Sequence, residues 1–395
     1  METLKFLLTS TFFPPYHIGG DAIHVGCLAQ ELTRLGHKVN VLHSIDAYEL
    51  KRKSIPKESG DTGIYVYSIK SPLHYTSYLA YLFGGSPLVE RKFKFLVNEI
   101  KPDIVHHHNI SLLSYRLLGK RSNYFNLYTA HDFWLVCQQN NLLKNGEFSC
   151  DDYSCLSCSI RRRRFPQVWR SFKGFKEVVD EIDCMIAPSD YLRNKISAQI
   201  PVRIETIPNF VPRPPLNIGK SGFSNFFLYA GVLEKHKGIL NLINLFADPH
   251  IESNLLIAGQ GSLMPSIKAS INKLGLEKKI ILLGWTNHDL LYRLLNDANA
   301  LIVPSICPEN NPLIILEAFS MGCPVIASRI GGIPEIVQKL NKNLVYEDLN
   351  TLRQLIMSFS KKEFSPEHIK SIYSQNYSPE AYVKKYFEKL NRCGS

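Results

Sequence analysis

Two doubly wound α/β domains are the fold class that this 395-residue sequence predicts. The length suits two domains of roughly 190 residues each. With 45% hydrophobic and 21% charged residues, the composition is that of an ordinary globular protein. Short β-rich runs alternate with helical segments through both halves of the chain. Such alternation produces right-handed βαβ units, which build a parallel sheet with helices on both faces.

The first domain is expected to span residues 1–200 and to contain six strands. Each strand is a short apolar run bounded by turn residues, and the runs lie at 5–12, 38–44, 63–69, 102–109, 126–132 and 184–190. The helical pattern HVGCLAQELTRLG separates the first two runs, and Gly36 closes it.

A second alternating series predicts another domain at residues 223–375. Its five β-rich runs lie at 226–233, 254–261, 280–285, 300–305 and 324–328. Five prolines within residues 201–222 indicate a linker between the two domains. Doubly wound sheets bind ligands outside the carboxyl ends of their strands, so we expect the ligand in a cleft between the domains.

The strand-to-helix segment PSICPENNPLIILEAFSMGC holds two glutamates eight residues apart. Pro312 suits the first helical position, with Asn311 as its cap, and Gly322 suits the stop. Glu309 therefore lies in the loop and Glu317 inside the helix. A helix N-terminus binds anions, and carboxylates accept hydrogen bonds from hydroxyl groups. The combination favours a nucleotide-activated sugar as the ligand.

This spacing resembles the Glu-x7-Glu motif of retaining glycosyltransferases, in particular glycosyltransferase family 4. The likeness continues through PVIASRIGGIPEI, and the segments KPDIVHHHN, IPNFV, AGVLEKHKG and IAGQGSL resemble other parts of that family. It covers nearly the whole chain. The resemblance implies the GT-B architecture, two Rossmann-like domains facing each other across a cleft. It also implies that a C-terminal helix within residues 376–395 crosses back to the first domain.

The family's functional positions carry over to nine residues. Three would be catalytic: His131, Lys237 and Glu309. Six would bind the donor: Gly19, Gly20, Asn310, Asn311, Leu313 and Glu317. By resemblance, Glu317 accepts hydrogen bonds from the ribose, and Lys237 stabilises the leaving diphosphate without a catalytic metal or other cofactor. Val232 stands where the family commonly has an arginine, which leaves open whether Lys235 or His236 supplies a second positive charge.

A Cys-rich insertion at residues 137–158 contains four cysteines, Cys137, Cys150, Cys155 and Cys158. Four thiolates in compact loops suit a structural zinc ion, although the C-x12-C-x4-C-x2-C spacing is not that of a standard zinc knuckle. Four reduced, unlinked thiols are the alternative. The chain has nine cysteines and no clear secretory signal, so we expect no disulfide framework and a cytoplasmic location.

The net charge of +11 and the pI of about 9.1 are compatible with nucleic acid, an anionic membrane or a phosphate-bearing substrate as partner. No RNP-like motif is present, which disfavours nucleic acid. The run Arg161–Arg164 precedes Phe165 and Trp169 and suits peripheral docking on anionic lipid at the inner membrane face. A solvated helix start is the alternative. No apolar stretch is long enough for a transmembrane helix.

The sequence therefore predicts an enzyme that moves a sugar from a nucleoside-diphosphate sugar to a hydroxyl acceptor, a polysaccharide or a lipid-linked glycan. The alternative is a non-catalytic GT-B protein that binds a nucleotide sugar or glycan as a partner or scaffold, and Val232 is its best support. Dinucleotide binding by GQGSL is disfavoured, because Met264 occupies the position of the third glycine.

Overall fold

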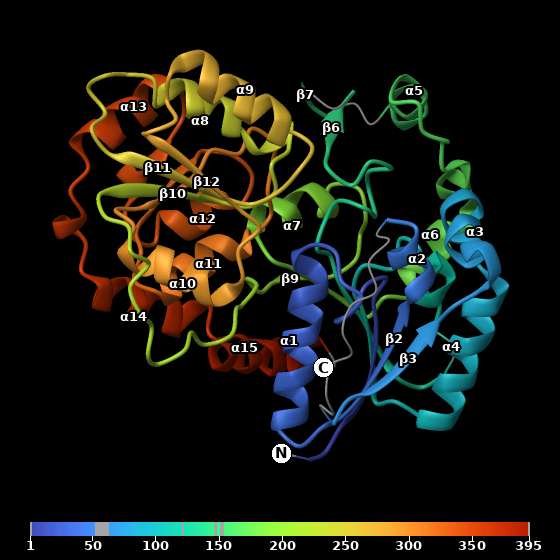
Figure 1. The fold of residues 1–395 in the computed structure, drawn as a ribbon. Coiled ribbons are helices and arrows are strands. Elements are labelled where there is room, and N and C mark those ends of the chain that lie inside the picture. The colour runs from blue at the N-terminus through green and yellow to red at the C-terminus, as the bar shows by residue number, and fades with distance from the viewer. Residues whose placement is uncertain (1, 52–62, 121, 146–147, 151–153, 394–395) are drawn as a thin grey trace. The chain divides into compact units, whose positions relative to one another are not determined.

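The computed structural model describes residues 2–51, 63–120, 122–145, 148–150 and 154–393. Its contacts divide the chain into two compact units, the first formed by Met1–Pro208 with Val383–Ser395 and the second by Asn209–Tyr382. Each unit is built around a parallel sheet that carries helices (Figure 1). The predicted fold class, two doubly wound α/β domains, is confirmed.

Seven parallel strands form the sheet of the first unit, in the order β3-β2-β1-β4-β5-β8-β9. Their bounds are β1 Lys5–Thr9, β2 Lys38–Ser44, β3 Tyr65–Ile69, β4 Ile104–His107, β5 Phe125–Thr129, β8 Cys184–Ala187 and β9 Ile204–Thr206. The central strands β1 and β4 are almost completely buried. A parallel strand that is buried on both faces reads as a continuous apolar run, which is why the sequence reveals these strands.

Helices and short 3₁₀ turns connect the strands of the first unit. They are α1 Gly20–Arg34, α2 Ile45–Glu49, η1 Pro72–His74, α3 Tyr75–Phe83, α4 Pro87–Ile100, η2 Tyr115–Leu118, α5 Cys155–Arg161, η3 Val168–Ser171, α6 Lys173–Asp180 and α7 Asp190–Ser197. A small antiparallel hairpin, β6 Leu143–Lys144 with β7 Phe148–Ser149, lies between β5 and α5.

The expected linker begins with a strand, and this corrects two predictions. The sequence predicts a linker at residues 201–222 and the last strand of the first half at 184–190. In the structure, β9 pairs with β8 through Ile204 and Glu205, and the first unit continues to Pro208. The sequence hides β9 because its three residues are only half-buried at the edge of the sheet and contain no apolar run.

The second unit contains a six-stranded parallel sheet in the order β12-β11-β10-β13-β14-β15. Its strands are β10 Phe226–Ala230, β11 Asn254–Ala258, β12 Ile280–Gly284, β13 Leu301–Val303, β14 Val325–Ser328 and β15 Val345–Tyr346. Five of them coincide with the predicted runs. The edge strand β15 has only two residues, too few for a recognisable pattern.

The helical elements of the second unit complete its alternation. They are η4 Lys235–Lys237, α8 Ile239–Leu245, α9 Met264–Leu274, α10 His288–Asp297, α11 Leu313–Ser320, α12 Ile333–Val337, η5 Lys342–Leu344, α13 Leu349–Ser358, η6 Lys361–Glu363 and α14 Pro366–Asn376. One large hydrophobic core joins them to the sheet.

The last helix, α15 Pro379–Cys393, starts in the second unit, and its residues from Val383 onward belong to the first. There Tyr386 contacts His106 through its hydroxyl group at 3.0 Å, and Lys389 forms an ion pair with Glu205 at 2.6 Å. Cys393 is bonded to Cys184 of β8 as a disulfide, a single bridge that the sequence analysis does not predict. The sequence separation of 209 conceals this pairing from the sequence.

In each parallel sheet, the direction in which successive strands are added reverses at one place. In the first unit this place lies between β1 and β4, and in the second between β10 and β13. At such a switch point the loops that follow the two strands leave in opposite directions and open a ligand-binding crevice. The loops after these four strands contain most of the predicted site residues.

Candidate functional site

In the second unit, the loops that follow β10 and β13 lie against each other. The backbone N–H of Ile306 donates a hydrogen bond to the carbonyl of His236 at 2.9 Å. Gly238 has φ +71°, and a Cβ there would lie 1.9 Å from the carbonyl oxygen of Pro304. Only glycine fits this close approach. The contact fixes Lys237, the preceding residue, beside the loop that contains Glu309.

A second glycine turn holds the backbone of Glu309. Gly331 has φ +61°, and a Cβ there would lie 2.4 Å from the carbonyl oxygen of Glu309. The N–H of Gly332 donates to that same carbonyl at 2.7 Å. The Gly-Gly turn after β14, which lies in the segment PVIASRIGGIPEI, therefore positions the first glutamate of the Glu-x7-Glu pair.

The side chains of Lys237 and Glu309 form an ion pair, with 2.6 Å between Nζ and Oε2. The hydroxyl of Ser305 donates a short hydrogen bond to the other carboxylate oxygen. Both charged side chains are mostly buried, at 23% and 15% exposed. The structure thus brings together two of the three predicted catalytic residues and adds Ser305, which the sequence analysis missed.

The surroundings of this pair alter the ionisation of three neighbours. Burial, followed by the nearby positive charge of Lys237, lowers the pKa of His236. Burial also raises the pKa of Tyr229, and the charge of Glu309 raises it further. The same two causes raise the pKa of Cys307 to about 11. A lowered pKa disfavours His236 as the second positive charge and leaves Lys235, at the same turn, as the other candidate.

Glu317 lies one helical turn inside α11, with its side chain only 14% exposed. Burial raises the pKa of its carboxyl group to about 7. His288 Nδ1 lies 3.6 Å from the carboxylate. A buried carboxyl group with a raised pKa, close to a helix N-terminus, is a candidate ligand-binding group, because titratable groups with perturbed pKa values cluster at functional sites.

The N-terminus of α11 differs in detail from the sequence prediction. Pro312 precedes the helix as its cap residue, and Leu313 is the first helical residue. Asn311 does not cap the helix; its side-chain oxygen accepts from the N–H of Asn209 at 3.1 Å. Asn310 lies in the same loop. Gly322, with φ +72°, follows the end of α11 as predicted.

In the first unit, the predicted glycine loop leads directly into a long helix. Gly19, with φ +89°, precedes α1, and Gly20 is its first residue. Asp21 in the first turn accepts a hydrogen bond from Asn109 at 2.8 Å, so the loops after β1 and β4 are tied together. Neither Asp21 nor Asn109 was singled out from the sequence, because a single carboxylate or amide has no recognisable spacing.

His131 belongs to a cluster of four imidazole rings at the ends of β4, β5 and α1: His24, His106, His108 and His131. His131 Nε2 lies 3.0 Å from Nδ1 of His108. Burial lowers the pKa of His131 to about 4, although the charge of Asp21 acts in the opposite direction. His107 points to the other face of the sheet and bonds Thr9 at 2.7 Å, as strand alternation predicts.

Two protein-family models match the chain, Glycosyltransferase Family 4 at residues 18–213 and Glycosyl transferases group 1 at residues 217–375. The structure superposes on sucrose-phosphate synthase from Thermosynechococcus elongatus with a TM-score of 0.73 over 98% of both chains, at 19% identity. The protein is a glycosyltransferase of the GT-B fold.

Two curated proteins are similar to this chain in sequence. An uncharacterized glycosyltransferase of Methanocaldococcus jannaschii is 25% identical over 346 residues, which are 85% of this chain and 83% of that protein. The UDP-Gal:α-D-GlcNAc-diphosphoundecaprenol α-1,3-galactosyltransferase of Escherichia coli is 33% identical over 151 residues, 33% of this chain and 38% of that enzyme.

The four cysteines of the Cys-rich insertion lie in the part of the chain that the structure describes. Cys137, Cys150 and Cys158 are buried, and burial together with the neighbouring thiols raises the pKa of Cys155. Among the described residues, no three histidine, cysteine, aspartate or glutamate side chains are arranged to hold a metal ion. Residues 146–147 and 151–153 of this insertion lie outside the described residues. A structural zinc ion held by these cysteines stays a prediction.

Proposed function

We propose that this glycosyltransferase uses a nucleoside-diphosphate sugar as donor and retains the anomeric configuration. One observation carries the proposal: a buried carboxylate, an ion-paired lysine and a helix N-terminus converge at the switch point of the second sheet. The partial positive charge of the α11 N-terminus suits a diphosphate. Glu317 suits the ribose hydroxyl groups, which donate hydrogen bonds to a carboxylate and so offset the cost of burying its charge.

In the proposed reaction, the bond between the anomeric carbon and the diphosphate oxygen breaks, and the nucleoside diphosphate leaves with the electron pair. The acceptor hydroxyl oxygen forms the new bond to that carbon on the face that the diphosphate leaves, as retention requires, and its proton passes to an oxygen of the departing diphosphate. Lys237 would stabilise the charge that grows on the leaving diphosphate, because a charge-assisted bond to it strengthens in the transition state. Glu309 holds the lysine amino group in position and would contact the donor sugar. This chemistry needs no metal ion.

For the acceptor, we propose a lipid-linked glycan or a growing polysaccharide. The support is the named acceptor of the Escherichia coli relative, a sugar on diphosphoundecaprenol. Gly19, Gly20 and His131 lie in the first unit, and their contact with donor or acceptor remains a prediction from the family resemblance.

Release of nucleoside diphosphate from a panel of UDP-, GDP- and ADP-sugars, with and without acceptor, tests the proposal. We expect acceptor-dependent release from one donor, resistance to a chelator, and a product whose anomeric configuration equals that of the donor by NMR. A protein that binds a donor but never releases the diphosphate with any acceptor class would instead be the non-catalytic binder. Inversion of configuration would overturn the retaining assignment.

A further inference from the structure

Exposed hydrophobic side chains concentrate in two short segments of the first unit. Of the 22 large hydrophobic side chains that are exposed among the described residues, ten lie within residues 73–83 and 156–172. These are Leu73, Tyr75, Tyr78, Leu82, Phe83, Leu156, Ile160, Phe165, Val168 and Phe172. Contiguous exposed apolar surface of this kind marks a place of interaction, whereas scattered single residues do not. We call these ten residues, with the exposed basic residues between them, the apolar-basic surface.

Helix α3 exposes its apolar face and buries its polar one. The buried residues of α3 are Thr76, Ser77 and Ala80. Tyr75, Tyr78, Leu82 and Phe83 recur at i, i+3, i+7 and i+8, which places them on one face, and that face is exposed. In a helix that only covers a core, the polar and apolar faces would be the other way round. The short helix α5 repeats this inversion, since Leu156 and Ile160 are exposed while Cys158 and Ser159 are buried.

The two segments are neighbours in space. The hydroxyl of Tyr81 in α3 donates to the carbonyl of Phe165 at 3.2 Å. The indole N–H of Trp169 donates to the carbonyl of Tyr81 at 3.1 Å. Figure 1 shows α3 and the segment below α5 on the same side of the first unit. Trp169 itself is buried, stacked on Tyr115, so it supports this surface from beneath rather than reaching out of it.

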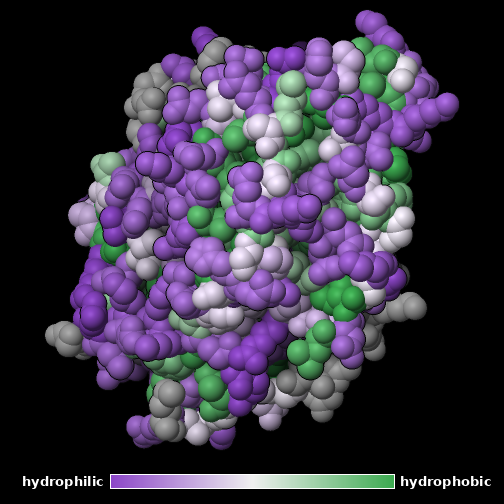
Figure 2. All heavy atoms as spheres, turned by 90° about the vertical axis from the view of Figure 1, so that its left-hand side faces the viewer, coloured by the Kyte–Doolittle hydropathy of each residue, from purple (hydrophilic) through white to green (hydrophobic). Residues whose placement is uncertain are grey.

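Charge distinguishes this surface from a simple apolar patch. Residues 155–176 contain seven basic side chains and no acidic one, and residues 71–89 contain no aspartate or glutamate. Arg161, Arg163 and Arg164 are exposed next to Phe165. By contrast, the face that Figure 2 shows, on the α13 and α14 side, is mostly hydrophilic with small scattered hydrophobic patches. A partner of the apolar-basic surface must accept both hydrophobic side chains and a dense positive charge.

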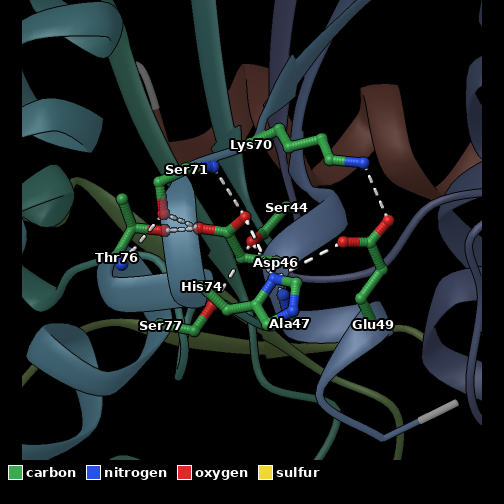
Figure 3. A network of polar contacts seen from close by, with 9 residues as sticks. All are labelled: Ser44, Asp46, Ala47, Glu49, Lys70, Ser71, His74, Thr76 and Ser77. Carbon is green, nitrogen blue, oxygen red and sulfur yellow. Dashed lines mark hydrogen bonds and ion pairs between the residues drawn. The ribbon is translucent and has the colours of Figure 1, made fainter. Parts of the chain in front are cut away.

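A buried polar network fixes the base of α3 (Figure 3). Asp46 of α2 is completely buried and accepts hydrogen bonds from the backbone and side chain of Ser71 and from the hydroxyl of Thr76. Ser44 and Ser77 lie 3.4 Å apart through their hydroxyl oxygens. The helix is therefore held by its polar side, so its apolar side faces outward in a fixed orientation.

We propose that the apolar-basic surface docks the protein on an anionic lipid bilayer. Amphipathic surface helices bind membranes by burying an apolar face at the boundary of headgroups and acyl chains while basic side chains contact anionic headgroups. The inverted exposure of α3 and α5 supplies the apolar face. Residues 155–176, which are basic and contain no acidic side chain, supply the contacts to anionic headgroups. Tyrosine rings such as those of Tyr75 and Tyr78 are amphipathic and suit the boundary between headgroups and acyl chains. Binding to lipid does not depend on the proposed reaction, so it is measured separately from sugar transfer.

Vesicle flotation of the full chain tests the proposal, with phosphatidylcholine vesicles compared with vesicles containing 30% phosphatidylglycerol, a chosen composition of about one anionic lipid in three. We expect binding to the anionic vesicles only, with loss at high salt because exposed charges are screened. Changing Arg161, Arg163 and Arg164 together to glutamine should weaken partitioning on the order of 100-fold, at about a factor of five for each basic residue near the surface.

A matched variant separates a local effect from net charge. Lys268, Lys273 and Lys278 are exposed on the second unit, and their change to glutamine alters the net charge equally. This control should bind vesicles like the wild type. A second pair of variants tests the apolar part: Tyr78→Ser with Phe83→Ser should reduce binding, whereas Leu274→Ser with Met357→Ser, at exposed positions elsewhere, should not.

Three results would overturn the proposal. They are no flotation of the wild type, an equal loss in the two triple variants, and self-association through this surface in sedimentation without lipid, which would make a second copy the occupant. Circular dichroism of each variant checks that it is folded. Sugar transfer to a soluble acceptor should persist in the arginine variant, so loss of lipid binding and failure of the proposed reaction are distinguishable.

Discussion

Replacing Glu317 by glutamine should remove a pH-dependent destabilisation of the second unit. Glutamine has the same shape as glutamate but does not ionise. Burial raises the pKa of Glu317 from 4.5 to about 7 in the folded protein. A carboxyl group with a raised folded-state pKa favours the folded state while it is protonated. That advantage is complete below the unfolded-state pKa and is lost as the pH rises through the folded-state value.

The magnitude follows from the two pKa values. Their difference, from 4.5 to about 7, corresponds to roughly 3 kcal/mol, at about 1.4 kcal/mol for a tenfold change in a proton-binding constant. About 2 kcal/mol of this should be lost between pH 5.5 and 8.5. The free energy of unfolding of the wild type should therefore fall relative to that of Glu317→Gln by about this amount as the pH rises.

The assay is urea unfolding of the full chain, read at Cys323 by thiol labelling and peptide mass spectrometry. Cys323 is completely buried in the second unit, so its labelling reports unfolding of that unit. Glu277→Gln, at an exposed position of the same unit, is the control. A difference between wild type and Glu317→Gln that stays constant with pH would refute the reasoning. The variant should also bind the nucleotide-sugar donor more weakly, although it is the more stable protein at pH 8.

Three further predictions follow from contacts in the structure. Lys237→Ala should lower kcat at least tenfold, about 1.4 kcal/mol of transition-state stabilisation, while Lys235→Ala changes it less; equal effects in steady-state assays would transfer the role to Lys235. Gly331→Ala should lower the melting temperature more than Gly275→Ala, because both have positive φ but only the first meets the Glu309 backbone; calorimetry with equal losses would contradict this. Metal analysis decides the zinc prediction: about one zinc per chain, in protein prepared without chelator, would confirm it, and none would reject it.

Much of the fold was readable from the sequence because buried parallel strands are continuous apolar runs. KVNVLHS coincides with β2, and five runs in the second half coincide with strands of its sheet. β9 and β15 were missed, since edge strands of two or three residues have neither length nor apolar pattern. Prolines around β9 moreover suggested a linker, whereas the strand pairs with β8 and completes the first sheet.

The sequence by itself determined where the chemistry-bearing residues fall: Glu309 in a loop, Glu317 in a helix and Lys237 after a strand. Spacing and Pro/Gly punctuation are local, so a linear pattern records them. Only the tertiary structure decided that Lys237 pairs with Glu309, 72 residues away, and that Gly331 holds the backbone of Glu309. Burial of Glu317 is likewise a property of packing, and it alone changes the ionisation of that carboxyl group.

The same limit explains the apolar-basic surface. The helical spacing of Tyr75, Tyr78, Leu82 and Phe83 indicates an apolar face, but the sequence cannot tell whether that face meets a core or solvent. The structure decides it, because Asp46 binds the polar side of α3 and turns the apolar side outward. Side-chain direction depends on contacts between segments distant in the chain, and those contacts exist only once the chain has folded.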